Sequence, residues 1–362
     1  MGESMRVLAL VTEAFGGYGG IAQYNRDLLA ALSQVECVSE VLVLPRFGTA
    51  SLCGLPAKVT QHPPTKSKAR YAASAIAAVR RMGRQDVIFC GHLHSAPLAD
   101  AMARITHLPI WLQVHGIDAW AQPPRITRNA AEKAALVTAV SRYTRSKVLS
   151  WAILDPSRVR VLPNTVRRQF TPGPTDDAVI RRLGLTGSKI ILTVARINKG
   201  DWQKGHSKVI EALPSIRKRY PDSVYVVVGE GDGRHDLEQL VARHGLERSV
   251  RFVGRLEDDE MLALYRAARV FVMPSRKEGF GIAFAEAAAA GLPVIAGNRD
   301  GSVDALADGV LGRLIDPDSH DQIVAAIIDA FEGRLQSQPE GVQRFAFKNF
   351  AKHVDELVRN YL

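Results

Sequence analysis

The sequence predicts an α/β protein made of two Rossmann-like domains. Short, continuous apolar runs recur along the chain, and most end in a glycine-rich or polar turn that is followed by a helical pattern. Such runs are typical of parallel sheets with helices on both faces. The pattern restarts after a turn-rich segment near the middle, and 362 residues are enough for two cores.

The turn-rich segment sets the predicted domain boundaries. Residues 164–174 contain several turn-forming residues, so we expect a linker there. The predicted organisation is a first domain over residues 1–163, a linker over 164–186, a second domain over 187–345 and an amphipathic C-terminal segment over 346–362.

Composition restricts the class of protein. With 46% hydrophobic and 23% charged residues, the chain is typical of a soluble enzyme and is not disordered as a whole. The three cysteines, Cys37, Cys53 and Cys90, lack metal-ligand or CxxC spacing, which favours a reducing compartment. No apolar run reaches the roughly 18 residues of a membrane span, and the N-terminus lacks a signal-peptide pattern. We therefore expect a cytoplasmic protein.

The net charge of +10 is concentrated in the first domain. Residues 1–163 carry 19 Lys and Arg against 10 Asp and Glu, which leaves a net charge of only +1 for the rest. A window over residues 41–85 has no acidic residue. Its basic residues are Arg46, Lys58, Lys66, Lys68, Arg70, Arg80, Arg81 and Arg84.

This basic window has three interpretations. Nucleic acid is disfavoured because no helix-turn-helix, zinc-finger or aromatic stacking pattern accompanies it. A basic amphipathic helix over residues 66–82 could lie on an anionic membrane surface, which would place the protein at the inner face of the cell membrane through residues 66–84. The alternative is a solvated face over an ordinary core stripe.

The first predicted strand, residues 6–12, leads into a glycine-rich loop. Gly16, Gly17, Gly19 and Gly20 surround Tyr18, and a helix is predicted over 21–32. Four glycines at a strand-to-helix turn permit close approach of the backbone to a ligand. The spacing is not a GxGxxG dinucleotide fingerprint.

Two further strands of the first domain end in histidines. The strand over 87–90 precedes His92 and His94, and that over 109–114 precedes His115 and Asp118. These side chains follow carboxyl ends of strands, where open α/β sheets form sites. Three histidines without a further carboxylate ligand make a poor metal site, and a single strand-end histidine is often only a hydrogen-bonded cap. The remaining strands of this half are predicted over 41–44, 135–140 and 159–163, and Ser141 is the predicted N-cap of a helix.

The second domain repeats the strand, turn and helix pattern. Arg196 follows a strand over 190–194, with Lys204-Gly205 eight residues later, and Arg255 follows a strand over 250–254. Residues 224–228 form another strand that ends in a glycine turn. An Arg and a Lys in a loop are commonly just exposed to solvent, so only their position in the repeated pattern suggests a function.

The most informative stretch spans residues 270–297. A strand over 270–274 enters a loop with Glu278, Gly279, Phe280 and Gly281, and an alanine-rich helix over 282–290 is followed by a strand over 294–296. The backbone N–H groups from Phe280 to Ile282 would lie at a positive helix end, which suits an anion. Carboxylates accept hydrogen bonds from sugar and ribose hydroxyls, so Glu278 and Glu286 fit a hydroxyl-rich ligand. Glu286 is the only charged residue between Glu278 and Arg299, which argues against an ordinary solvated helix face.

Residues 278–286 resemble the Glu-x7-Glu motif of retaining, nucleotide-sugar-dependent glycosyltransferases of family four, which have the GT-B fold. The flanking PS-x-x-EGFG and A-x-GLPVIA strings make the match specific. The resemblance implies two Rossmann-like domains facing each other across a cleft, with the C-terminal helix packed on the first domain.

The resemblance also implies roles for individual residues. Glu278 would hold hydroxyls of the transferred sugar, Glu286 would bind the ribose, and Arg196 and Lys204 would bind the diphosphate. Further donor contacts would come from Gly17, Gly19, Gly20, Phe280, Gly281, Ile282 and the backbone near Arg255. His115 would lie beside the donor sugar, and Tyr18, His92, His94 and Asp118 are candidates for the acceptor. The chain departs from the family pattern at Thr165, which replaces a glycine, and at 300–304, where Asp300-Gly301 stands in place of Gly-Gly.

The expected reaction is retaining transfer of a hexose from a GDP-mannose or UDP-hexose type donor to a hydroxyl of a glycan or lipid-linked acceptor, in cell-envelope or polysaccharide biosynthesis. We expect no metal and no cofactor besides the nucleoside-diphosphate sugar as co-substrate, because two cations would replace the metal and Asp316-Pro-Asp318 is interpreted as a turn. The alternatives are a non-hydrolysing sugar-nucleotide epimerase and a non-catalytic nucleotide-sugar-binding protein.

Overall fold

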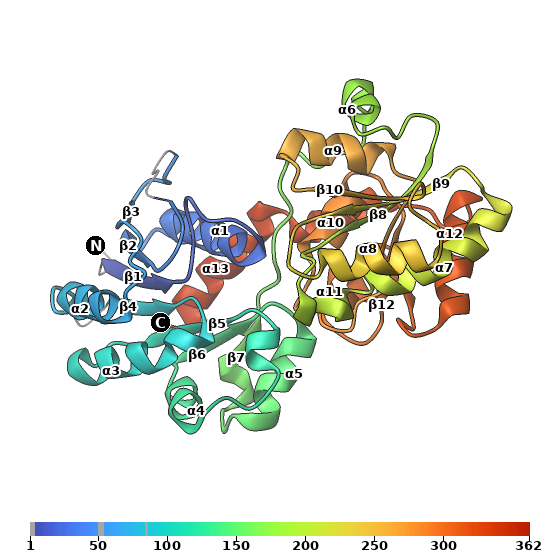
Figure 1. The fold of residues 1–362 in the computed structure, drawn as a ribbon. Coiled ribbons are helices and arrows are strands. Elements are labelled where there is room, and N and C mark those ends of the chain that lie inside the picture. Colours follow the sequence, from blue (N-terminus) through green and yellow to red (C-terminus); the bar gives the residue numbers. More distant parts are fainter. Residues whose placement is uncertain (1–3, 50–53, 84–85) are drawn as a thin grey trace. The chain divides into compact units, whose positions relative to one another are not determined.

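The computed structural model of the chain describes residues 4–49, 54–83 and 86–362, without the side chains of 200–202 (Figure 1). The chain divides into two compact units. The first contains the residues up to Thr165 together with Phe347–Leu362, and the second contains Val166–Ala346.

The first unit is built on a parallel sheet of seven strands. In the order of the sheet they are β3 (Val59–Gln61), β2 (Val38–Pro45), β1 (Met5–Val11), β4 (Val87–Cys90), β5 (Ile110–Val114), β6 (Leu136–Ala139) and β7 (Val159–Val161). All six strands predicted for this half are present. The seventh, β3, was not predicted, because its sequence Val-Thr-Gln contains one apolar residue and so lacks the continuous apolar run of the other strands.

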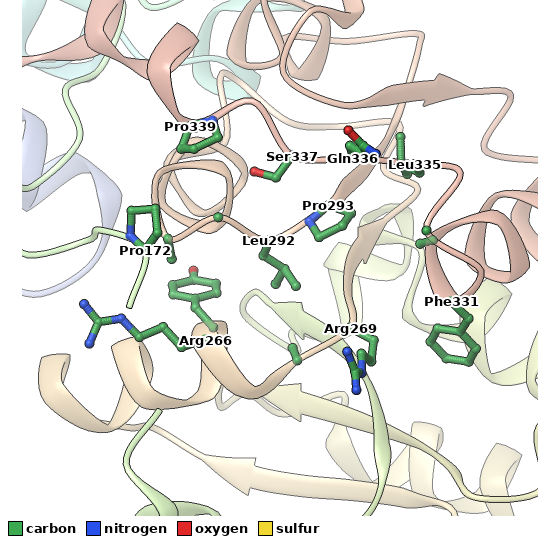
Figure 2. A pocket seen from close by; sticks show the side chains of 16 residues that line it. Pro172, Arg266, Arg269, Leu292, Pro293, Phe331, Leu335, Gln336, Ser337 and Pro339 are labelled. Atoms are coloured by element: carbon green, nitrogen blue, oxygen red, sulfur yellow. The ribbon is translucent and has the colours of Figure 1, made fainter. Parts of the chain in front are cut away.

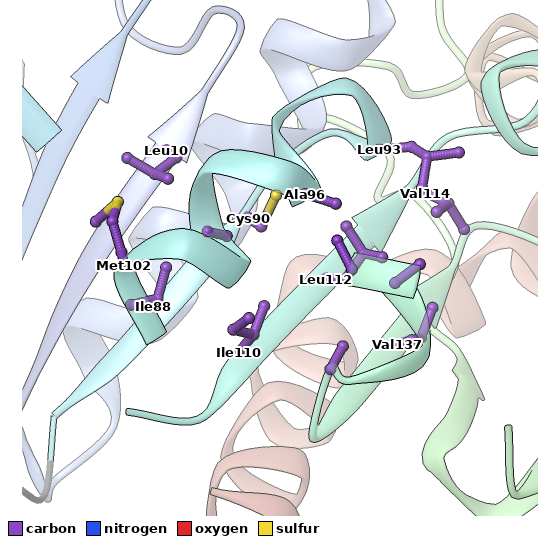
Figure 3. Close-up of a cluster of buried hydrophobic side chains, with 14 of the residues drawn as sticks. Leu10, Ile88, Cys90, Leu93, Ala96, Met102, Ile110, Leu112, Val114 and Val137 are labelled. Atoms are coloured by element: carbon purple, nitrogen blue, oxygen red, sulfur yellow. The ribbon is translucent and has the colours of Figure 1, made fainter. Parts of the chain in front are cut away.

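Helices cover both faces of this sheet. Helices α2 (Lys68–Val79), α3 (Ala96–Thr106), α4 (Arg125–Glu132) and α5 (Arg142–Trp151) pack on one face, and Figure 3 shows part of that core, where Met102 and Ala96 lie over Ile88, Cys90 and Leu112. On the other face Tyr24 of α1 (Gly20–Gln34) donates to Gln113 of β5 at 2.7 Å. Leu112 and Gln113 are adjacent in the strand and therefore point to opposite faces. Phe350 of α13 (Phe347–Tyr361) packs edge-on against Tyr24, so α13 covers the same face as α1.

The second unit has a parallel sheet of six strands. Their order is β10 (Val250–Gly254), β9 (Ser223–Val228), β8 (Lys189–Val194), β11 (Val270–Met273), β12 (Val294–Gly297) and β13 (Arg313–Ile315). Helices α7 (His206–Arg219), α8 (Arg234–Arg243) and α12 (His320–Phe331) pack on one face. The remaining elements are α6 (Asp177–Arg182), α9 (Asp258–Ala267), α10 (Ile282–Ala289), α11 (Ser302–Ala305) and the 3₁₀ segments at Lys199–Lys204, Ala307–Gly309 and Pro339–Phe345.

Both sheets reverse their strand order at one position. In the first sheet the chain proceeds from β1 outwards to β3 and then returns to β4 beside β1; in the second it proceeds from β8 to β10 and returns to β11 beside β8. Loops at the carboxyl ends of two such neighbouring strands diverge, which opens a crevice for a ligand. The expected binding positions are therefore the carboxyl ends of β1 and β4, and of β8 and β11.

The segment predicted as a linker packs on the second unit from Val166 onwards. Val166 forms a parallel bridge with Ala346, and the Thr175 hydroxyl donates to the carbonyl of Ala263 in α9 at 2.8 Å. Arg266 of α9 donates to the carbonyl oxygens of Thr171 and Pro174 at 2.9 and 3.2 Å. These bonds hold residues 171–175 on the surface of α9, and the bridge holds Val166 beside Ala346.

A cavity of about 570 Å³ lies at the amino ends of two strands of the second sheet (Figure 2). Arg269 and Pro293, which line it, directly precede β11 and β12 and so mark the amino ends of these strands. The cavity therefore lies away from the binding positions expected at the carboxyl ends. No helix among the described residues is long and apolar enough to cross a membrane.

Candidate active site

Lys204 and Glu278 form an ion pair at the reversal point of the second sheet. Lys204 ends the 3₁₀ segment after β8, and Glu278 lies in the loop after β11. Because β8 and β11 are parallel neighbours, both side chains lie at the carboxyl ends of these strands. Lys204 Nζ lies 2.6 Å from Glu278 Oε2 and donates to the carbonyl of Lys277 at 3.0 Å. The side chains are only 9% and 18% exposed, so water screens this pair weakly.

Asp300 fixes the loop that carries Glu278. Its Oδ2 accepts from the Glu278 N–H and from the Ser275 hydroxyl, both at 2.7 Å, and its Oδ1 accepts from the Ser302 N–H at 2.9 Å. Burial raises the pKa of Asp300, and the bonds from Ser302 and Ser275 oppose this. The sequence showed position 300 only as a departure from the family pattern. A signal was present, since Asp before Gly-Ser often bonds the N–H two residues later.

Two glycines are required by close packing in this region. Gly281 caps the start of α10 at φ 91°, and a Cβ there would come within 2.4 Å of the Phe284 ring. A Cβ on Gly301 would lie 1.9 Å from the carbonyl oxygen of Gly279. Phe280 is buried against Phe345, and no side chain caps the start of α10. The N–H groups at this helix end are therefore held in place and suit an anionic ligand.

Glu286 lies inside α10 and is buried, so it does not belong to a solvated helix face. Burial raises the pKa of its carboxyl group, and Arg167 opposes this. Arg167 donates to Glu286 Oε1 from Nε at 3.1 Å and from Nη2 at 2.9 Å, and the Tyr265 hydroxyl lies 3.4 Å from Oε2. Sequence reasoning missed Arg167 because it lies in the segment interpreted as a linker.

The other two predicted donor residues lie on exposed loops of this edge. Arg196 follows β8 and is exposed, and its carbonyl oxygen lies 3.4 Å from Nε2 of the buried His206. Arg255 follows β10 and lies 3.7 Å from Glu230, which belongs to the turn after β9. Both arginines therefore follow carboxyl ends of strands in the sheet that carries Lys204 and Glu278.

The glycine-rich loop after β1 is held by side chains of its own unit. The carbonyl of Gly17 accepts from Arg26 Nη1 at 2.8 Å, and Glu13 Oε2 accepts from the Tyr18 N–H at 3.3 Å. Gly19 has φ 86°, and a Cβ there would meet nothing within 4 Å. The Tyr18 side chain is 69% exposed, and Gly20 begins α1. The loop thus has a fixed base and an open outer side.

The structure brings the three histidines and Asp118 together at the carboxyl ends of β4 and β5. His115 Nε2 lies 2.9 Å from the carbonyl oxygen of Gly91, and Asp118 accepts from the His115 N–H at 3.2 Å. His92 Nδ1 accepts from the His94 N–H at 3.2 Å, and the His92 ring lies 4.6 Å from that of His94 and 6.0 Å from that of His115.

Burial sets the protonation of this cluster. It lowers the pKa of His92 to about 4 and also lowers the pKa of His115, while Asp118 opposes both shifts. The two rings are therefore neutral at pH 7 and can offer one donor and one acceptor each. No group of three or more His, Cys, Asp or Glu side chains in the described part of the chain could hold a metal ion.

Comparisons with known proteins show the family to which the chain belongs. Residues 18–170 match the family described as Glycosyltransferase Family 4, and residues 176–347 match Glycosyl transferases group 1. The chain belongs to the family-four glycosyltransferases. It is an enzyme of the hexosyltransferase class.

Two curated relatives are 30% identical to this glycosyltransferase over the aligned residues. The GDP-mannose-dependent alpha-(1-6)-phosphatidylinositol monomannoside mannosyltransferase of Mycolicibacterium smegmatis is 30% identical over 279 residues, which cover 73% of this chain and 72% of that protein. The alpha-D-kanosaminyltransferase of Streptomyces kanamyceticus is 30% identical over 261 residues, or 68% of this chain and 66% of that protein.

A solved structure shows the same fold. The crystal structure of Anabaena HepE in complex with UDP and glucose superposes with a TM-score of 0.79, covers 98% of this chain and 99% of that chain, and is 20% identical. The predicted GT-B fold of this glycosyltransferase is thereby confirmed.

Proposed function

We propose that this enzyme transfers a hexose, with retention of anomeric configuration, from a nucleoside-diphosphate sugar of the GDP-mannose or UDP-hexose type. The observation that carries the proposal is the Lys204–Glu278 pair beside the uncapped start of α10, at the reversal point of the second sheet. A cation, a carboxylate and a positive helix end together suit a ligand that combines a diphosphate with a hydroxyl-rich sugar. The relatives named for GDP-mannose and UDP support this class of donor.

Each donor group has a residue suited to it. Lys204, Arg196 and the N–H groups of Phe280, Gly281 and Ile282 bind the diphosphate. Glu278 accepts from hydroxyls of the transferred sugar, and Glu286 accepts from the ribose. The backbone near Arg255 contacts the base. Gly17, Gly19 and Gly20 have no side chains, so the backbone of this loop can come close to the donor.

The chemical step needs no side-chain nucleophile. The bond from C1 of the hexose to the diphosphate oxygen breaks, and the acceptor oxygen bonds to C1 on the same face. The proton of the acceptor hydroxyl passes to the leaving phosphate oxygen. Cations and N–H groups fixed before the reaction stabilise the negative charge that develops on that phosphate.

The acceptor is a glycan or a lipid-linked sugar, in cell-envelope or polysaccharide biosynthesis. Tyr18, His92, His94 and Asp118 are proposed to contact it, and His115 lies with them at the carboxyl ends of β4 and β5. Neutral imidazoles and a carboxylate can hydrogen-bond acceptor hydroxyls without adding positive charge. The mannosyltransferase relative, which acts on a phosphatidylinositol mannoside by name, supports a lipid-linked acceptor.

We also propose that the reaction uses no metal and no further cofactor. The carboxylates of the Asp-x-Asp sequence are engaged by arginines: Asp316 lies 2.7 Å from Arg299, and Asp318 lies 2.9 Å from Arg299 and also pairs with Arg276. They follow β13, two strands away from β11. This arrangement supports a structural turn.

A direct test incubates the enzyme with GDP-mannose or UDP-glucose and a glycan or lipid-linked acceptor. The proposal expects release of nucleoside diphosphate and a product whose anomeric configuration, read by NMR, equals that of the donor. Inverted product would contradict retention. Conversion of the donor sugar to its epimer in the absence of acceptor would favour the epimerase alternative.

The basic window supports a membrane-associated acceptor. Lys66, Lys68, Arg70, Arg80 and Arg81 are exposed at the two ends of α2, whereas Tyr71, Ala75 and Val79 face the core. Two other members are engaged in the fold. Lys58 donates to carbonyl oxygens of Val35 and Val38, and Arg46 stacks on Tyr71. Arg84 lies outside the described residues. We propose that the exposed cations bind an anionic lipid surface at the inner face of the cell membrane.

Changing Arg70, Arg80 and Arg81 to Glu should release the enzyme from vesicles that contain phosphatidylserine. Each Lys or Arg contributes about 1 kcal/mol near an anionic leaflet, so a triple charge reversal should abolish co-sedimentation. The matched control changes Lys218, Arg243 and Arg248, which are exposed on the second unit, to Glu. Equal loss in both variants, or no vesicle binding by the unmodified enzyme, would leave the solvated-face interpretation standing.

A further inference from the structure

The segment that enters the second unit supplies an arginine to the carboxylate proposed to bind the ribose. Arg167 Nε and Nη2 both donate to Glu286 Oε1, at 3.1 and 2.9 Å. Two N–H groups on one carboxylate oxygen restrict the orientation of the carboxylate and favour its ionised form. The Glu286 side chain is 9% exposed, so no comparable stabilisation can come from bulk water.

Arg167 is itself held by two other contacts, and one of its partners, Asp258, is fixed by a further hydrogen bond. It pairs with Asp258 at the start of α9, and its guanidinium carbon lies 4.6 Å from the centroid of the Phe170 ring. Gln169 donates to the second oxygen of Asp258 at 3.0 Å. The Arg167 side chain is 26% exposed, and the network fixes it before any ligand arrives. The guanidinium is thus pre-organised rather than recruited from solvent.

We infer that Arg167 is a positioning residue for donor binding: it keeps the Glu286 carboxylate ionised and turned so that its remaining lone pairs can accept the ribose hydroxyls. This inference rests on the proposed ribose contact of Glu286. Oε1 accepts two bonds from Arg167 and Oε2 accepts one from Tyr265, which leaves part of the acceptor capacity of the carboxylate for the ligand.

The surroundings of Glu286 determine what happens when Arg167 is removed. Burial raises the pKa of Glu286, Arg167 lowers it, Asp258 raises it and Tyr265 lowers it. Helix α10 also packs against α11 and the 3₁₀ segment Pro339–Phe345, whose titratable residues are Asp304, Glu340 and Arg344. Without Arg167, burial and the negative charge of Asp258 would both still raise the pKa of the Glu286 carboxyl group, and the main opposing charge would be gone. The pKa of Glu286 would therefore rise further.

The test titrates the full-length protein with GDP and UDP by calorimetry across pH 6 to 9. In Arg167→Met, Glu286 should be protonated at the lower pH values, so the dissociation constant should rise about tenfold or more there, the loss expected for one charge-assisted hydrogen bond. The defect should shrink as the pH rises, because the carboxyl group ionises again. Arg167→Lys keeps the charge and should restore a profile close to that of the unmodified protein, with partly reduced affinity.

Arg168→Met is the matched control, because Arg168 is adjacent and exposed, and its affinity should be unchanged. A defect in Arg167→Met of equal size at every pH, or no defect, would overturn the inference. The variant Glu286→Gln shows whether the role of Arg167 or the proposed ribose contact of Glu286 is wrong. If Glu286→Gln binds as well as the unmodified protein, the ribose contact itself is wrong; if it binds weakly while Arg167→Met binds normally, only the role of Arg167 is wrong.

Discussion

Replacing Lys204 by alanine should lower turnover by about 10²-fold or more, the scale seen when one pre-organised group that stabilises a developing negative charge is lost. Two of the three Lys204 N–H groups have partners in Glu278 and the Lys277 carbonyl, at 2.6 and 3.0 Å. The third is left for a diphosphate oxygen. Initial rates at saturating donor would measure the effect, and the fall should lie mainly in kcat because charge on the leaving phosphate grows in the transition state.

The matched control for this substitution is Lys208→Ala. Lys208 also pairs with a glutamate, Glu211 at 3.2 Å, but both side chains are about 40% exposed on α7. Its loss should leave turnover unchanged. Transfer by the unmodified enzyme should also survive EDTA. The opposite result would be that EDTA abolishes transfer, manganese restores it and Lys204→Ala stays active. A metal, and not this lysine, would then neutralise the diphosphate.

Replacing Glu278 by alanine should also reduce turnover by about 10²-fold or more, and the effect should not add to that of Lys204→Ala. Glu278 is both the proposed acceptor of hydroxyls from the transferred sugar and the partner that orients Lys204. Residues that act as one unit give single losses nearly as large as the double loss. The measurement is a double-mutant cycle on kcat, with Lys208→Ala and Glu211→Ala as the parallel control cycle.

The outcome of that cycle discriminates between two roles for the pair. A double variant no slower than either single variant supports a joint role in catalysis. Losses that multiply would mean that the two residues act independently. If Glu278→Ala kept full activity while Lys204→Ala lost it, the sugar contact of Glu278 would have to be abandoned.

The strands and the Glu278 loop could be predicted from the sequence because they depend on local patterns. Buried parallel strands are continuous apolar runs, and Gly281 is required by a local backbone angle of φ 91° and by the adjacent Phe284. Local sequence also set Glu286 apart from an ordinary solvated helix face, since no other charge accompanies it in α10. These features needed no knowledge of distant parts of the chain.

The bond of Asp300 to Glu278 and that of Arg167 to Glu286 could not be predicted, because they depend on which distant segments meet. Arg167 and Glu286 are separated by 119 positions, and Asp300 and Glu278 by 22. The sheet order places β12 next to β11 and so brings Asp300 beside the Glu278 loop, and the packing of the segment after Val166 on α9 brings Arg167 to Glu286. The basic window illustrates the same limit. Charge counting could not reveal that Lys58 and Arg46 are used inside the fold.

The central claim, that the second unit binds the nucleotide part of the donor, is tested most directly by calorimetric titration of full-length variants with GDP and UDP. The account predicts that Glu286→Gln and Lys204→Ala each weaken binding about tenfold or more, because each loses a charge-assisted contact. His92→Ala and Tyr18→Ala, both in the first unit, should bind the nucleotide as the unmodified protein does. Normal binding by the first two variants together with weak binding by the last two would contradict the account and assign the nucleotide to the first unit.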